Sequence, residues 1–379
     1  MLRNRKKERI TRMFKEAPSN FNIEQLLGAS LEDIDEIIEN KDAHIRRLSI
    51  PKKSGGLRSI IVPDKKLKYI QKGIYWRILK KYKPSDAAHG FVSKRGIVTN
   101  ARLHVGASAL GKIDIKNFFD TISTDHLKNC LFGNKILCRN CKHYVRMMDG
   151  LCNPSLYHNK VKNYEFKCEE IKAVFIPDYC TATGYQSLIT RVIELCTFNN
   201  FCAQGFPTSP VLANIVMRGF DKAMLEFSAQ HNITYSRYAD DLAFSSKTLG
   251  KSELAKLITN KAYQQLWAYN FWPNKKKTSW KGKAGRLKVC GIVVNKKTSI
   301  QKNVVRKFRS KVHHATVIDA DKTTKKMIRK LKGWASYLMS VNQLQGRKYM
   351  DKLVAFEKSK FKSVPANDVI KVGENCGGT

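Results

Sequence analysis

Two adjacent carboxylates, Asp240 and Asp241, lie between two short runs rich in β-branched and aromatic residues, and this pattern restricts the local fold strongly. Residues 233–237 (Ile-Thr-Tyr-Ser-Arg) and 242–245 (Leu-Ala-Phe-Ser) alternate in part between apolar and polar side chains. Such alternation is typical of β-strands. The segment therefore predicts a hairpin whose tip carries both acids. The alternative is a solvated turn, because Asp is a common turn residue and most Asp-Asp pairs bind nothing.

A third acid favours a functional interpretation of this hairpin. Asp114 lies in the apolar run 110–115 (Leu-Gly-Lys-Ile-Asp-Ile), and two aromatic residues follow at 118–119. Burying an unpaired carboxylate is costly, so Asp114 is expected to lie beside a cation. Three carboxylates from two neighbouring strands can hold two Mg²⁺ ions about 3.5 to 4 Å apart, as in nucleic-acid polymerases, where the ions activate a 3′-hydroxyl and stabilise the leaving pyrophosphate.

The net charge of the chain agrees with a polyanionic partner. Its 379 residues include 70 Lys and Arg against 31 Asp and Glu, a formal net charge of +39. This excess is larger than solubility requires. A membrane surface would attract the same charge, but the sequence has no run of 18 apolar residues and no separate amphipathic anchor. Because the basic residues are spread along the whole chain, nucleic acid is the favoured partner, with a steep salt dependence of binding.

The cysteines and the first residues bear on the compartment. The chain begins Met-Leu-Arg-Asn-Arg-Lys-Lys and lacks the apolar core of a secretory signal, so we expect a cytoplasmic protein; a basic organellar transit peptide is the alternative. The ten cysteines are then expected as reduced thiols or metal ligands.

Several of these cysteines fall in a stretch of poor periodicity at about 131–180, which predicts an insertion. Cys138 and Cys141 have the spacing of a zinc knuckle. Four ligands for a structural Zn²⁺ would be completed from Cys152, Cys168, His143 and His158. Free thiols in an irregular insertion are the favoured alternative.

The first half of the chain also contains a second predicted hairpin. Residues 1–48 predict a helical extension, and the apolar runs on either side of Ser-Gly-Gly at 54–56 predict two paired strands. Arg58 on the second of these strands is a candidate for bidentate contact with a nucleotide triphosphate, although most surface arginines have no such role.

Further candidates follow in the second half. The turn-rich loop 203–210 leads into a helix, and Gly205 would let its backbone approach a base pair. Lys277 lies in a lysine run that either approaches a triphosphate or forms a solvated face. From about 301 the chain is expected to be helical, and its cations beside aromatic residues suit a duplex or structured RNA. These cations include Arg306, Lys307, His313 and His314.

An ordered set of motifs resembles the reverse transcriptases. The set comprises Asp114 with Phe118 and Phe119, then Gln204, Gly205, Pro207, Ser209 and Pro210, then Tyr-Ala-Asp-Asp at 238–241, then Asn274, Lys277 and Thr278. Two further features are similar to those of bacterial retron reverse transcriptases: Asn-Ala-x-x-His at 100–104 and Val-Cys-Gly at 289–291, where the family has Val-Thr-Gly. The resemblance covers about 48–355. Cys290 departs from the family pattern, and the cysteine-bearing insertion is longer than is usual.

This resemblance implies an α+β, right-hand polymerase fold with an antiparallel palm sheet and a helical thumb. After the extension at 1–48, the fingers would occupy 49–105, the palm 106–300 with the insertion at about 131–180, and the basic thumb and tail 301–379.

The resemblance also implies roles for individual residues. Asp114, Asp240 and Asp241 would bind two Mg²⁺ ions, with the Ile115 carbonyl as an extra ligand. Around the nucleotide, Phe119 would crowd out a ribose 2′-hydroxyl, Gln204 would line the pocket, Arg58 would contact the triphosphate, and Lys277 would donate a proton to pyrophosphate. The RNA surface would be formed by the basic thumb, including Arg306, Lys307, His313 and His314, with Asn100 and His104 helping to shape it.

The implied activity is that of a retron RNA-directed DNA polymerase. Such enzymes use dNTPs to copy a cognate structured noncoding RNA (msr-msd), start from a guanosine 2′-hydroxyl, and yield branched RNA-linked single-stranded DNA (msDNA). The implied partners are this RNA and its DNA product, a separate effector protein in phage defence, and the host ribonuclease H that trims the template; no membrane is involved.

Three other interpretations compete with this one. A group II intron reverse transcriptase is disfavoured because no maturase or endonuclease region follows the expected thumb. A non-catalytic RNA-binding protein on a polymerase scaffold is disfavoured by the intact acid triad. A viral RNA polymerase is less favoured, since Ala239 and Phe119 together suit deoxynucleotide selection.

Overall fold

The computed structural model describes residues 23–52, 55–132, 136–137, 144–145 and 182–361. Its contacts divide the chain into two units, Met1–Cys290 and Gly291–Thr379. No helix among the described residues is both long enough and apolar enough to cross a bilayer.

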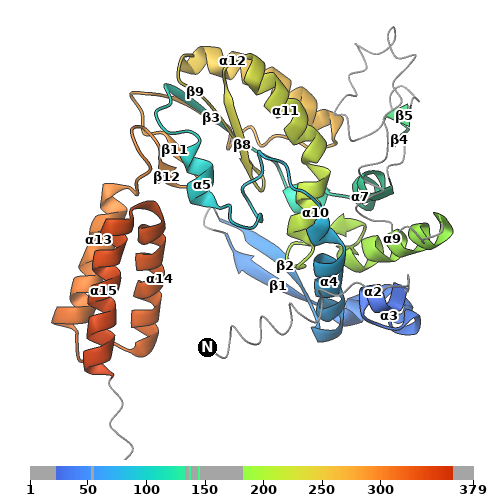
Figure 1. Ribbon diagram of the computed structural model, residues 1–379, viewed down its shortest axis with the longest axis horizontal. Coiled ribbons are helices and arrows are strands. Elements are labelled where there is room, and N and C mark those ends of the chain that lie inside the picture. The colour runs from blue at the N-terminus through green and yellow to red at the C-terminus, as the bar shows by residue number, and fades with distance from the viewer. Residues whose placement is uncertain (1–22, 53–54, 133–135, 138–143, 146–181, 362–379) are drawn as a thin grey trace, which may run out of the picture. The chain divides into compact units, whose positions relative to one another are not determined.

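A four-stranded antiparallel sheet lies at the centre of the first unit (Figure 1). Its strand order is β10 (Ser279–Gly282), β3 (Ala109–Asp114), β9 (Asp241–Ser246) and β8 (Thr234–Tyr238). The predicted hairpin around the two acids is confirmed, because β8 and β9 pair from Thr234 opposite Ser245 to Tyr238 opposite Asp241. Leu242 and Phe244 are fully buried, and the Phe244 ring stacks on Tyr235 at 4.9 Å.

Two long helices, α11 (Arg218–Gln230) and α12 (Lys251–Ala268), pack against this sheet (Figure 1). Their apolar side chains enter the main core, which also takes residues from the strands. Phe220 of α11 contacts the Tyr235 ring edge-on at 6.4 Å. Helix α5 (Ile97–Arg102) contacts β8 and the short strand β11 (Lys288–Val289).

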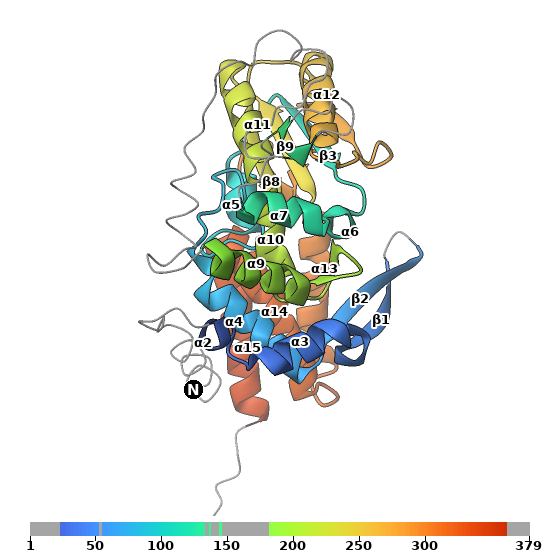
Figure 2. The same cartoon turned by 90° about the vertical axis from the view of Figure 1, so that its right-hand side faces the viewer.

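A helical layer continues the core beyond the sheet, and Figure 2 shows α7, α9 and α10 side by side within it. Its helices are α2 (Ile23–Leu27), α3 (Leu31–Glu39), α4 (Lys65–Arg77), α6 (Phe118–Thr121), α7 (Thr124–Phe132), α9 (Ala182–Cys196) and α10 (Ser209–Val216), with the 3₁₀ turns η1 (Lys41–His44) and η2 (Leu79–Lys81). Helix α3 begins directly after Ser30, whose hydroxyl accepts a hydrogen bond from Asp33 N–H. Asp64 caps α4 in the same way.

The second predicted hairpin is also confirmed. Strands β1 (Ile45–Pro51) and β2 (Leu57–Pro63) pair in antiparallel register along their whole length. Most of the hairpin is exposed, and in Figure 2 it projects from the helices. Three further pieces complete the unit: the strand pairs β4 (Ile136–Leu137) with β5 (Tyr144–Val145), and β6 (Thr197–Phe198) with β7 (Phe201–Cys202), and the strand β11 named above.

The second unit is helical, as its sequence predicts from about 301. It contains β12 (Ile292–Val293), α13 (Lys302–His313), the π-helical turn η4 (His314–Ile318), α14 (Lys325–Val341) and α15 (Gln343–Lys360). Its core is separate from the first and consists of Phe308, Val312, Ala315, Ile328, Leu331, Ala335, Leu338 and Leu353. The second unit therefore has the apolar core that independent folding requires.

One glycine sets how closely α14 and α15 approach. A Cβ added to Gly346 would lie 2.2 Å from Met339 Cα, so Gly346→Ala must push two backbones apart. We expect a loss of about 1 to 3 kcal/mol or more in the free energy of unfolding of the second unit, measured by urea titration of the full chain. Gly333 on α14 is the matched control, because its added Cβ would meet nothing within 4 Å. Gly333→Ala should stabilise the helix by about 0.5 to 1 kcal/mol; equal effects of the two changes would contradict this packing.

Candidate active site

The ends of β3 and β9 bring the three predicted acids together. Asp114 and Asp241 are direct register partners. Tyr238 pairs with Asp241, so Ala239 and Asp240 form the two-residue turn between β8 and β9. The Ile115 N–H donates a 3.0 Å hydrogen bond to the Asp240 carbonyl, which ties the turn to β3.

The turn carries backbone strain at Ala239, whose φ is +56°. Two-residue hairpins need positive φ in the turn because only this twist matches the flanking strands, and glycine or asparagine usually supplies it. Alanine in this conformation costs on the order of 1 to 3 kcal/mol. Ala239 is buried against the backbone of Gly90, where an added Cβ would lie 2.8 Å from Ala239 N.

Burial and the repulsion between neighbouring carboxylates raise the pKa values of Asp240 and Asp241. Burial raises the pKa of Asp240 to about 6, and the charges of Asp241 and Asp114 add to the rise. Burial likewise raises the pKa of Asp241, although Lys112 and Lys277 oppose it. The cluster therefore carries more negative charge than its surroundings compensate.

Lys277 is the nearest cation to Asp114. Its Nζ lies 2.7 Å from Asp114 Oδ1, and the lysine side chain is 60% exposed. The hydrogen bond to Asp114 raises the pKa of Lys277, so its ammonium stays charged at neutral pH. The Asn274 N–H donates to the Asp114 carbonyl at 2.7 Å. The Asn274–Lys277 segment thus lies directly beside the first acid.

The donor chemistry of this site suits a hard cation. Within the described ranges, no group of three or more His, Cys, Asp or Glu side chains already has the arrangement of a metal-binding cluster, and at this site the Lys277 ammonium neutralises Asp114. Three carboxylates and the Ile115 carbonyl are nevertheless the oxygen donors that Mg²⁺ prefers. A cation would also relieve the repulsion that raises the Asp240 pKa.

The predicted nucleotide-contacting residues lie on three neighbouring segments. The Phe119 ring on α6 is half-buried, 5.4 Å from Phe118 and 6.2 Å from Phe91. The Gln204 carbonyl accepts a 2.8 Å hydrogen bond from Ile61 N–H on β2. Arg58 is exposed on the same strand, opposite Ile50.

Gly205 makes a close backbone contact within the protein itself. A Cβ there would lie 2.5 Å from the Ile61 carbonyl oxygen, and the residue has φ +121°. The close backbone approach that the sequence suggested for a base pair is therefore made to β2. As a result, the 203–210 loop and the β1–β2 hairpin are held together.

The prediction that Asn100 and His104 help to form an RNA surface needs correction, because both side chains are 1% exposed. His104 lies between two hydroxyls, Ser245 Oγ and Ser236 Oγ, each at 2.7 Å. Burial lowers the pKa of His104 to about 3, so the ring is neutral. The Asn100 amide donates to Cys290 Sγ at 3.3 Å. His104 therefore joins β8 to β9, Asn100 bonds to the residue after β11, and neither side chain reaches the surface.

The remaining candidates are the RNA-binding residues of the second unit, which are exposed, and the zinc ligands, which the structure does not describe. The basic candidates of the second unit, Arg306, Lys307, His313 and His314, are all exposed on α13 and at the start of η4. The proposed zinc ligands Cys138, Cys141, Cys152 and Cys168, with His143 and His158, lie outside the described residues.

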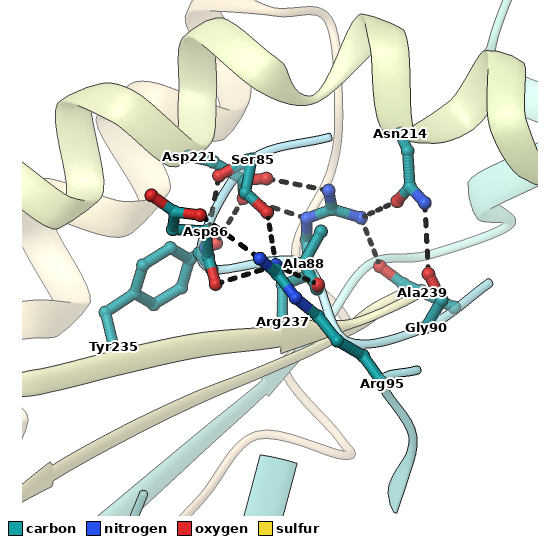
Figure 3. A network of polar contacts seen from close by, with 11 residues as sticks. Ser85, Asp86, Ala88, Gly90, Arg95, Asn214, Asp221, Tyr235, Arg237 and Ala239 are labelled. Carbon is teal, nitrogen blue, oxygen red and sulfur yellow. Dashed lines mark hydrogen bonds and ion pairs between the residues drawn. The ribbon is translucent and has the colours of Figure 1, made fainter. Parts of the chain in front are cut away.

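The sequence interpretation missed a buried ion pair behind the acids. Arg237 and Asp221 are both fully buried, and the guanidinium contacts the carboxylate twice, Nε to Oδ1 at 2.8 Å and Nη2 to Oδ2 at 2.7 Å. Tyr235 adds a 2.8 Å hydrogen bond to Asp221. Figure 3 shows Arg237 between Asp221 and Asn214. An arginine within a predicted strand was the available signal, since a charge that becomes buried there needs a partner.

The same guanidinium holds the turn that carries Asp240. Arg237 Nη1 donates to Asn214 Oδ1 at 3.1 Å and to the Ala239 carbonyl at 3.3 Å. Asn214 in turn donates to the Gly90 carbonyl at 3.0 Å (Figure 3). Helices α10 and α11 are therefore connected through one side chain to the position immediately before the paired acids.

A loop at 85–95 runs beside β8 and completes this arrangement. Its backbone bonds to Arg237 on both sides, from His89 N–H to the Arg237 carbonyl at 2.8 Å and from Arg237 N–H to the Ala87 carbonyl at 2.7 Å. Arg95 closes the loop by donating to three of its carbonyls, those of Ser85, Asp86 and Ala88 (Figure 3).

The buried pair yields a prediction about stability. Asp221→Leu leaves the Arg237 charge buried without its carboxylate, and Arg237→Met does the converse. We expect each single change to cost about 3 to 5 kcal/mol. The double variant should lose clearly less than the sum, because no charge is left uncompensated. Chemical unfolding of the four proteins measures this, and strict additivity would show that the two residues do not depend on each other.

Comparisons with known proteins agree with this site. A family model described as reverse transcriptase (RNA-dependent DNA polymerase) matches residues 163–294, which include Asp240 and Asp241. The Retron Ec86 reverse transcriptase of Escherichia coli is 26% identical over 342 residues, covering 89% of this chain and 89% of the relative. The Retron Mx65 reverse transcriptase of Myxococcus xanthus is 26% identical over 270 residues, but this chain spans only 56% of its length.

Two more similarities have been found. The Retron Mx162 reverse transcriptase of Myxococcus xanthus is 24% identical over 83% of this chain and 61% of the relative. Among solved structures, a telomerase from Candida albicans in complex with a fragment of telomeric RNA covers 83% of this chain and 56% of its own, at a TM-score of 0.43 and 13% identity; so weak a likeness supports no argument. The retron matches and the reverse transcriptase family model agree with the three acids brought together here, and they support a retron reverse transcriptase, an RNA-directed DNA polymerase.

Proposed function

We propose that this chain copies a cognate structured noncoding RNA (msr-msd) into branched, RNA-linked single-stranded DNA by two-metal nucleotidyl transfer, as part of a retron that acts in phage defence. The observation that carries the proposal is the juxtaposition of Asp114, Asp240 and Asp241 at the ends of adjacent strands. A merely RNA-binding scaffold has no need to keep three repelling carboxylates together, since their repulsion costs stability.

In this proposal the acids hold two Mg²⁺ ions together with the Ile115 carbonyl. When bound, the ions activate the attacking hydroxyl and stabilise the leaving pyrophosphate. Lys277 keeps a proton on Nζ beside Asp114, and this is the proton that it would give to the pyrophosphate. Because the Asp114 carboxylate forms an ion pair with Lys277, this carboxylate would both bind metal and position the proton donor.

The nucleotide pocket is proposed to lie between the fingers and the palm, with the fingers at 49–105, the palm at 106–300 and the thumb from 301, after an extension at 1–48. Phe119 would contact the sugar of the incoming dNTP, and Gln204 would line the nucleotide pocket. Arg58 would contact the triphosphate. The contact of the 203–210 loop with β2 supports a common pocket for Gln204 and Arg58.

RNA is proposed to bind the exposed basic residues of α13 and of the start of η4. Arg306, Lys307, His313 and His314 are solvent-accessible, and the strong positive charge of the chain favours phosphate contacts. We place the reaction in the cytoplasm, with an effector protein and the host ribonuclease H as partners. The similarity to retron enzymes over 89% of the chain favours this function over that of a group II intron enzyme.

Replacing one acid tests the catalytic proposal. Asp240→Asn removes a negative ligand while keeping its shape, so we expect primer extension with Mg²⁺ to fall at least about a thousandfold, equivalent to about 4 kcal/mol of transition-state stabilisation. RNA binding, measured by filter retention, should persist. Asp125→Asn on the exposed face of α7 is the matched control and should extend normally. Undiminished synthesis by Asp240→Asn would refute the metal-site assignment.

The product tests the retron proposal separately. Protein purified from its native host should carry a single-stranded DNA whose gel mobility shifts after ribonuclease treatment and again after debranching, because it is joined to RNA through a 2′-linked branch. The Asp240→Asn protein, expressed in the same host, should carry the RNA without this DNA. An active polymerase that carries no branched species would favour the intron-type alternative.

A further inference from the structure

Phe91 is an aromatic residue in the 85–95 loop that neither folding nor the roles described above explain. Its φ is +62°, a conformation that bulky side chains rarely adopt. The residue is also 49% exposed, so burial of apolar surface does not compensate for the strain. Non-glycine residues in this region persist where the surrounding structure forces them, and they cluster at functional sites.

The surrounding contacts hold Phe91 beside the catalytic turn. The residue before it, Gly90, packs its backbone against Tyr238 and Ala239, and the Gly90 carbonyl accepts a hydrogen bond from Asn214. Arg95 closes the loop on its other side. The Phe91 backbone is therefore fixed relative to Asp240 through the same contacts that fix the turn.

The Phe91 ring lies against two residues of the site. Its centroid is 6.2 Å from that of Phe119 and 6.4 Å from that of Tyr238. Phe119 has Phe118 on one side, at 5.4 Å, and Phe91 is its second aromatic neighbour. Phe118 is buried in the core, whereas Phe91 is half-exposed. The position of the Phe119 ring therefore depends on an exposed neighbour from another segment.

We propose that Phe91 is a sugar-selecting residue, which positions Phe119 and forms with it a two-ring apolar wall against the 2′-hydroxyl of a ribonucleoside triphosphate. The inference rests on the proposed function and extends it to a residue outside the matched motifs. An aromatic ring offers a hydroxyl no hydrogen-bond partner, so a ribose pressed against this wall loses a hydrogen bond to water. A Phe119 ring without its neighbour could rotate away and admit the ribose.

The test uses variants that distinguish the effect of the Phe91 ring from the effect of its strained backbone. Glycine and asparagine both tolerate positive φ, so Phe91→Gly and Phe91→Asn remove the ring and relieve the strain. The purified full chain is assayed for single-nucleotide addition to a DNA primer on an RNA template, with kcat/KM measured for a dNTP and for the matching rNTP. We expect the ratio of the two values to fall about tenfold, while the melting temperature stays level or rises.

Three further proteins make the result specific. Phe119→Ala should lower the same ratio, because it removes the other ring. Phe91→Tyr keeps an aromatic ring at this position and should keep the wild-type ratio of kcat/KM for the dNTP to kcat/KM for the rNTP. Trp267→Ala is the matched control, since Trp267 on α12 is an aromatic residue of equal exposure, 48%, outside the site; it should leave the ratio unchanged.

The outcomes are distinct. A wild-type ratio in folded Phe91→Gly or Phe91→Asn overturns the inference while leaving the polymerase function intact. Lower melting temperatures in both variants overturn it as well, because Phe91 would then be a structural residue. A wild-type chain that adds no dNTP refutes the proposed function itself.

Discussion

The turn formed by Ala239 and Asp240 depends on one buried ion pair. Arg237 and Asp221 have no solvent exposure, and two desolvated charges of this kind seldom add net stability. The pair instead fixes the position of the turn, because the Arg237 Nη1 group donates hydrogen bonds to Asn214 and to the Ala239 carbonyl. A hydrophobic pair of equal volume would pack as well, but it would leave the strained turn before Asp240 without a tether. The cost of the ion pair is thus best explained by the site that it holds.

Strain and uncompensated charge are both concentrated around that turn. Ala239 and Phe91 adopt positive φ within two neighbouring segments, and the Asp240 pKa is raised to about 6 by burial and adjacent carboxylates. Each feature alone opposes folding. They persist because the 85–95 loop bonds to the Arg237 backbone, while Asp221 of α11 and Asn214 of α10 bond to the Arg237 guanidinium. The scaffold therefore stabilises a local structure that would otherwise relax, and a site that must accept cations benefits from that preorganisation.

Local patterns in the sequence predicted the elements that carry the site, but not the contacts between them. The alternation of apolar and polar residues, together with the turn residues, was sufficient to predict both hairpins. The position of an acid within an apolar run was sufficient to identify Asp114 as a candidate site residue. The misjudged residues have distant partners: His104 bonds to serines 141 and 132 positions away. A polar residue without a visible partner is expected at the surface, so its burial could not be foreseen. Gly205 is similar, because its neighbour is a strand far earlier in the chain.

The two retron-like motifs prove to be one structural feature, which clarifies the departure at position 290. Asn100 on α5 donates to Cys290 Sγ, and Cys290 follows β11 with φ +48°. A threonine hydroxyl could both accept from the amide and donate to its oxygen, whereas a thiol is a weak donor. Consistent with this, Asn100 Oδ1 is buried with no hydrogen-bond partner among the described residues. Cysteine thus keeps the size and the acceptor of a threonine at this position, and it gives up one internal hydrogen bond to Asn100.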